Sequence, residues 1–116
     1  MNEFRLSGTL VERAALRFTP AGVPVVEAQF RHRSDVIEAG LPRTLEFDVS
    51  AIGLGPMAGA LEHEPLGAQL DLSGFIAPRS RRSRRLVLHV TGLRARAADR
   101  AAADLESGSE HVSDRS

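Results

Sequence analysis

The chain has 116 residues, enough for one compact domain and not for two, and 42% of them are hydrophobic. It has no Cys, which excludes disulfides and thiolate metal sites, and no apolar run of about 18 residues that could span a membrane. All 15 basic residues are Arg, and the net charge of zero hides an asymmetry: residues 1–96 carry 13 Arg against 10 acids, whereas residues 97–116 carry 2 Arg against 5 acids. We expect a basic domain at 1–96, an acidic disordered tail at 97–116 and, since no signal peptide pattern is seen, a cytoplasmic location.

The sequence pattern predicts mostly β-strands. Apolar and polar residues alternate with a period of two, which is typical of strands with one buried face. The alternation predicts five strands, at residues 4–11, 26–31, 44–51, 68–76 and 86–93. Two Pro and a Gly in residues 18–24 predict a turn, and the polar segment 34–42 predicts a hairpin loop.

A short helical turn is expected between the third and fourth strands. Pro56, within residues 53–61, suits the first position of a helix, where an N–H would have no partner. The spacing of Gly53, Gly55 and Gly59 departs from a G-x-G-x-x-G nucleotide fingerprint, so we interpret these glycines as part of a strand-to-helix turn. Five strands in this order indicate a Greek-key barrel, whereas a β-sandwich usually has about seven. We therefore predict an all-β, five-stranded OB-fold barrel.

The segment between the last two strands is the strongest functional signal. Residues 79–85, here called the arginine loop, carry five Arg in seven positions. Crowded guanidinium groups favour an anionic partner, and the loop between the fourth and fifth strands of an OB fold flanks its nucleic-acid-binding face. A solvated loop that protects a strand edge is the alternative. We favour a nucleic-acid contact made by Arg79, Arg81, Arg82, Arg84 and Arg85, with hydroxyl donors from Ser80 and Ser83.

A second basic group surrounds the predicted 34–42 hairpin. Arg31 and Arg33 end the second strand and Arg43 opens the third, so Arg33 and Arg43 are expected to lie close together. Other arginines that could extend this group are Arg5, Arg13 and Arg17.

Aromatic platforms, which often accompany a basic groove in single-strand binding, are scarce. All five aromatic residues are Phe. Their positions in the alternation assign Phe4, Phe30, Phe47 and Phe75 to the core and leave only Phe18, beside a turn, free to stack. We expect phosphate contacts to dominate binding, with weak base preference.

The sequence indicates neither an enzyme nor a metal site. Its four His share no metal-ligand spacing, and its Ser, His and acidic residues form no triad or carboxylate pair. We therefore predict no catalytic residue, no metal and no cofactor.

Several short motifs resemble the bacterial primosomal replication protein N (PriB) family. They are Leu-Ser-Gly-Thr at 6–9, Pro-Ala-Gly-Val-Pro at 20–24, His-Arg-Ser at 32–34, Glu-Ala-Gly at 38–40, Gly-Phe-Ile at 74–76 and Leu-Val-Leu-His at 86–89. The resemblance covers about residues 2–96, and the broader relatives are single-stranded-DNA-binding proteins. The tail at 97–116 falls outside the family pattern.

The resemblance implies an OB-fold homodimer that binds single-stranded DNA in replication restart. It also implies work with the restart helicase PriA and other primosome proteins such as DnaT, toward loading of the replicative helicase. The DNA-binding residues carried over by position are Arg17, Arg33, Arg43, Arg79, Arg81, Arg82, Arg84 and Arg85. The chain departs from the family at Leu41 and Glu46, where members can have an aromatic residue.

Two functional hypotheses follow. In the first, the protein is an OB-fold dimer that binds single-stranded DNA through the basic groups, and its apolar first strand pairs with that of a second copy. In the second, it is a protein-interaction adaptor whose arginine loop docks a helicase or other acidic partner, with DNA contact incidental. The two basic groups favour the first and the scarcity of aromatics favours the second. We also predict that the acidic tail folds back onto the arginine loop and weakly inhibits DNA binding.

Overall fold

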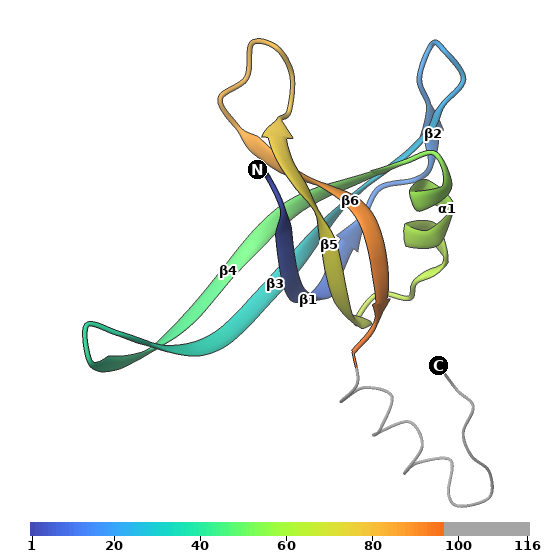
Figure 1. The fold of residues 1–116 in the computed structure, drawn as a ribbon. Helices are drawn as coiled ribbons and strands as arrows, with labels where there is room; N and C mark the ends of the chain where they lie inside the picture. Colours follow the sequence, from blue (N-terminus) through green and yellow to red (C-terminus); the bar gives the residue numbers. More distant parts are fainter. Residues whose placement is uncertain (97–116) are drawn as a thin grey trace, which may run out of the picture.

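The computed structural model describes residues 1–96, and the predicted tail at 97–116 lies outside the described residues. Strands make up most of the described chain (Figure 1). The elements are β1 (Phe4–Arg13), β2 (Arg17–Phe18), β3 (Pro24–Glu38), β4 (Leu41–Leu54), α1 (Pro56–His63), β5 (Gln69–Pro78) and β6 (Leu86–Ala95). All five predicted strands are present, each longer than the alternation indicated, together with the short strand β2.

The five long strands close into a barrel. The sheet order is β1-β5-β6-β4-β3-β2, and the additional pairing of β1 with β3 completes the circle. All pairings are antiparallel except the short one between β4 and β6. A barrel of five strands with one helix after the third long strand is the predicted OB fold.

The core is aliphatic with a single aromatic ring at its centre. Phe30 on β3 is fully buried, as is Leu10, its partner across the β1–β3 pairing. The helix α1 contributes Ala58 and Leu61 to the same cluster. Gly53 on β4 lets the helix approach, because a Cβ there would lie 2.7 Å from Leu61 Cδ1. Pro56 occupies the first helical turn as expected, and Gly55 forms the strand-to-helix turn. Gly53 and Gly59, also assigned to that turn, lie instead within β4 and within α1.

The predicted hairpin loop at 34–42 is wrong. β3 continues to Glu38 and β4 begins at Leu41, so the connection is the two-residue turn Ala39–Gly40. Both turn residues have positive φ, 54° and 78°, as a type I′ turn requires. Residues 31–48 form an arm that projects from the barrel (Figure 1). Polar residues and Pro42 are tolerated there because the two-stranded ribbon buries neither face fully, so its sequence lacks a clean alternation.

Three phenylalanines assigned to the core are exposed instead. Phe4, Phe47 and Phe75 have relative exposures of 48%, 43% and 39%. Phe75 lies on the outer face of β5, because Leu72 and Ile76 point inward at alternate positions. Phe4 and Phe47 share the inward side with Phe30 but lie where β1 and the arm extend past the closed part of the barrel.

Candidate nucleic-acid interface

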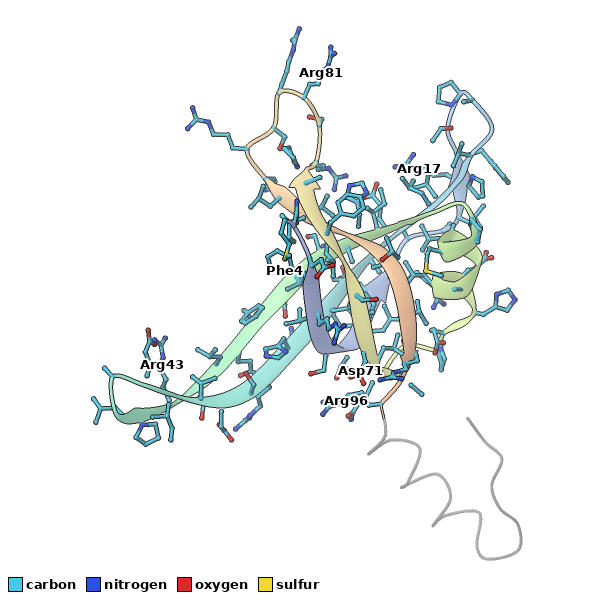
Figure 2. The ribbon with its side chains drawn as sticks, viewed as in Figure 1. Phe4, Arg17, Arg43, Asp71, Arg81 and Arg96 are labelled. Atoms are coloured by element: carbon cyan, nitrogen blue, oxygen red, sulfur yellow. The ribbon has the colours of Figure 1, made fainter. Side chains whose placement is uncertain are left out.

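The arginine loop stands at the end of the β5–β6 hairpin. Its ends are joined by a hydrogen bond from the Arg79 N–H to the Arg85 carbonyl, at 2.8 Å. The hydroxyl oxygen of Ser83 accepts from the backbone N–H of Arg85, at 2.9 Å. Ser83 therefore holds the loop together as well as offering a hydroxyl. This small closed loop projects its arginines into solvent, and Figure 2 shows Arg81 at its tip.

Four of the five loop guanidinium groups form no ion pair within residues 1–96. They belong to Arg81, Arg82, Arg84 and Arg85, and all four residues are exposed. Four cations on seven residues of chain are not neutralised by the described part of the protein. An external polyanion is the ligand that would remove their mutual repulsion.

The fifth loop arginine is tied to the barrel through Glu27. Arg79 Nη2 lies 3.0 Å from Glu27 Oε1, and Arg17 Nη2 lies 2.7 Å from Glu27 Oε2. The hydrogen bond from Arg17, followed by the charge of Arg79, lowers the pKa of the Glu27 carboxyl, against the opposing effect of its partial burial. The side chain of Glu27 is 27% exposed. Its carboxylate binds both guanidinium groups and keeps them beside the loop.

A small hollow of about 140 Å³ lies beside this cluster, and His89, one member of an aromatic pair, lines it. Its lining includes Arg17, Glu27, Arg79 and His89. The ring of Phe75 stacks on that of His89, with centroids 4.8 Å apart and planes 13° apart. Phe75 and His89 face each other across the β5–β6 pairing on the outer face of the barrel. This pair gives the loop a flat aromatic neighbour on which a base could stack.

The two arginines on the arm do not lie together as predicted. Arg33 is paired with Glu46 and Arg43 with Val36, and the two pairs are three positions apart along each strand. Arg33 and Arg43 therefore lie on opposite faces of the arm. Arg43 makes an ion pair with Glu38, and Figure 2 shows it near the arm tip, far from Arg81.

The remaining arginines of the predicted stripe also separate. Arg13 donates to the backbone carbonyls of Leu61 and Glu64, which ties β1 to the end of α1. Arg5 lies on the outer face of β1 beside β5, and only Arg17 joins the loop. Of the predicted DNA-binding residues, the structure thus groups Arg17 and Arg79 with the other four loop arginines and leaves Arg33 and Arg43 on the arm.

Sequence reasoning missed Glu27, Phe75 and His89. The alternation of β5 contained the signal for Phe75, because Leu70 and Leu72 fix which face is buried. The ring partner His89 and the double ion pair of Glu27 depend on strand register, and no local pattern reveals that. No group of His and acidic side chains in residues 1–96 has a geometry for holding a metal ion. The helix in the same range is too short and too polar to cross a membrane.

Comparison with known proteins identifies relatives of this chain. A family described as another single-strand binding protein family matches residues 2–92. The replication restart protein PriB of Bordetella pertussis is 42% identical over 90 residues, covering 78% of this chain and 84% of its own. That of Nitrosomonas europaea is 38% identical over 93 residues, covering 80% and 86%.

Solved structures agree with the sequence relatives. PriB from Ralstonia solanacearum has a TM-score of 0.75 at 38% identity, covering 83% of this chain and 99% of its own. A deletion mutant of the single-stranded DNA binding protein from Thermus aquaticus has a TM-score of 0.66 at 16% identity, covering 83% of this chain and 50% of its own, which shows the shared fold.

The closed barrel, the helix after its third long strand and the basic loop define a class, the OB-fold proteins of single-strand binding type. Within that class, sequence identity to PriB proteins over most of the chain identifies the family. The chain belongs to the PriB family of replication restart proteins.

Proposed function

We propose that the protein binds single-stranded DNA during replication restart, with the arginine loop as its principal contact. The observation that carries the proposal is the set of four loop arginines that form no ion pair within residues 1–96, on the same β5–β6 hairpin as the Phe75–His89 stack. Guanidinium forks bind phosphate oxygens in pairs, and the ring pair offers a sequence-independent surface for a base. Arg17 and Arg79 border the same surface, and Arg33 and Arg43 on the arm extend the contact to longer strands.

Several relatives support the role in restart by name, as replication restart proteins PriB. These names describe restart rather than a catalysed reaction, and we propose a binding protein without enzymatic activity. We further propose that it works in the cytoplasm with the restart helicase PriA and DnaT, stabilising the helicase–DNA complex and promoting assembly for loading of the replicative helicase.

We also propose that the protein is a homodimer, paired through β1. Residues Phe4–Thr9 pair with β5, but β3 pairs with β1 only from Thr9 onward, so one edge of the first half of β1 has no strand beside it in the described chain. The exposed rings of Phe4 and Phe47 lie on the inward side near this edge. A second copy would cover both the edge and the rings.

Sedimentation measures the dimer directly. The wild type is expected to sediment as a dimer, and Phe47→Ser is expected to shift it toward monomer. Ile37→Ser, on the opposite face of the same arm, is the matched control and should leave the dimer unchanged. A monomeric wild type would overturn this part of the proposal.

Binding to a bare oligonucleotide separates DNA binding from the adaptor hypothesis. Fluorescence anisotropy of a labelled single-stranded oligonucleotide would be measured with the wild type and with a variant carrying Ala at the five loop arginines. We expect binding by the wild type at low salt and much weaker binding by the variant. An adaptor would leave the bare oligonucleotide unbound even at low salt, and that result would shift the proposal to an acidic protein partner.

A further inference from the structure

A trough on the outer face of β1, β5 and β6 has no role in the site described above. It encloses about 590 Å³ and is lined by residues 5–7 of β1, 71–73 of β5 and 92–94 of β6. Those that matter here are Arg5, Ser7, Asp71, Ser73, Gly92 and Arg94. Asp71 lies at the end of the β5–β6 hairpin opposite Arg81, as Figure 2 shows. Eight residues of extended chain separate Asp71 from Arg79, or about 26 Å.

The walls of the trough carry positive charge that the described chain does not neutralise. Arg5 and Arg94 are exposed and form no ion pair within residues 1–96. They lie on either side of β5, with Arg5 opposite Ser73 and Arg94 opposite Asp71. Asp71 is the one acidic residue in the lining, and its carboxylate lies 3.6 Å from Arg96 Nε. The trough therefore has an excess of cationic groups.

The floor of the trough suits an extended anionic chain. Ser7, Ser73 and Gly92 are small, so the surface is hollow between the two arginines. The Ser7 hydroxyl has no hydrogen-bond partner within residues 1–96, whereas its carbonyl accepts from His32 Nδ1 at 2.7 Å. Two strand spacings, or about 10 Å, separate the strands of Arg5 and Arg94. Hydroxyl and guanidinium donors spaced in this way match successive phosphates better than a single compact anion.

The lining favours nucleic acid over an acidic peptide. The leucines that line the trough, Leu6, Leu72 and Leu93, alternate with the outward residues and belong to the barrel side, so no exposed apolar pocket is present to anchor a peptide side chain. Arg31, Arg33 and Arg96 line a neighbouring hollow of about 430 Å³ that shares Ser7 with the trough, together with the acids Asp35 and Glu46. Arg31 is ion-paired with Asp48 and Arg96 with Asp71, so this hollow adds little net positive charge to that of the trough.

We propose that the trough is a second phosphate-binding site, which holds the backbone of a further segment of nucleic acid without reading its bases. It is separate from the arginine loop, so one chain would hold two segments of DNA at opposite ends of the β5–β6 hairpin. The contact is electrostatic and open, with the affinity of non-specific binding, about 10⁻⁴ to 10⁻⁶ M.

Stoichiometry tests the second site directly. The full-length protein would be titrated at low salt with a labelled oligothymidylate of about eight nucleotides, a length within the range that one OB fold covers. We expect two oligonucleotides per chain for the wild type, one for R5A/R94A and one for the variant with Ala at the loop arginines. R5K/R94K keeps the charge and is expected to retain two. Counting per chain makes the result independent of dimerisation.

The possible outcomes separate the two proposals. One oligonucleotide per wild-type chain, lost in the loop variant and kept in R5A/R94A, would overturn the second site and leave the proposed function standing. One oligonucleotide lost only in R5A/R94A would overturn the arginine loop as the principal contact and support the trough. No binding would overturn both. A different result would be an oligoglutamate peptide that binds the wild type but not R5A/R94A, while DNA binds only the arginine loop. That result would show that the trough binds an acidic peptide and would overturn the proposal that it binds nucleic acid.

Discussion

Glu27 and Arg79 form a 3.0 Å ion pair that fixes the base of the arginine loop to β3. The same carboxylate accepts a hydrogen bond from Arg17 at 2.7 Å, so one acid on the barrel restrains two of the arginines proposed to meet DNA. Phosphate oxygens and this carboxylate compete for the same guanidinium groups. We therefore expect Glu27 to limit the affinity of the proposed site while it positions the loop.

Replacing Glu27 with Gln is expected to tighten DNA binding. The substitution releases Arg17 and Arg79 and removes a negative charge beside the loop, so we expect affinity at low salt to rise severalfold and to depend more steeply on salt. Anisotropy titrations measure both quantities. The matched control is Glu62→Gln, an exposed acid on α1, which should change neither. Weaker binding by Glu27→Gln would show that positioning outweighs competition.

The same residue predicts a pH dependence of folding stability. Arg17 and Arg79 hold the pKa of Glu27 below its ordinary value, so the ionised carboxylate stabilises the folded state. That contribution is complete above the unfolded pKa of about 4.3 and is lost as the pH falls through the lower folded value. Urea unfolding should show the wild type more stable than Glu27→Gln at neutral pH, with the difference shrinking in acid. A difference that does not change with pH would contradict this assignment.

Phe75 is expected to contribute stacking to DNA affinity. Its ring is 39% exposed on His89 beside the loop, and stacking of one base is worth about 1–3 kcal/mol. Phe75→Ala should therefore weaken oligonucleotide binding by roughly fivefold to a hundredfold. Phe75→Leu keeps an apolar side chain without a ring and should lose affinity to a similar extent. If the Leu variant binds as the wild type does, the ring packs against the protein and does not stack on DNA.

The alternation of apolar and polar residues predicted the barrel, because each strand of the closed barrel buries one face and exposes the other. It failed at the arm, where neither face is fully buried and residues 34–38 continue β3. The pattern also placed Arg33 beside Arg43, because the short Ala39–Gly40 turn was not foreseen and the register of the two strands was therefore unknown. A change of one residue in register moves a side chain to the opposite face. The loop arginines could be predicted because they are contiguous. The Phe75–His89 stack and the Glu27 ion pairs could not, since each joins side chains from elements distant in sequence.

Alanine substitutions at two glycines are expected to change the free energy of unfolding in opposite directions. A Cβ on Gly74 would lie 1.8 Å from the His89 carbonyl oxygen, at the irregularity of the β5–β6 pairing, so Gly74→Ala must displace backbone. We expect a loss of about 2–3 kcal/mol or more in the free energy of unfolding. A Cβ on Gly59 in α1 meets open space, so Gly59→Ala should gain about 0.5–1 kcal/mol. Urea denaturation measures both, and a Gly74→Ala variant as stable as the wild type would contradict the strand register described here.

The salt dependence of DNA binding tests the central claim most directly. Four loop arginines form no ion pair within residues 1–96 and could neutralise about four phosphates. Each contributes roughly 0.7 to the slope of log K against log salt for a single strand, so the wild type should show a slope near −3. The variant with Ala at Arg79, Arg81, Arg82, Arg84 and Arg85 should show a much flatter slope and far weaker binding. An unchanged slope in that variant, or no binding by the wild type at low salt, would contradict the arginine loop as the DNA contact.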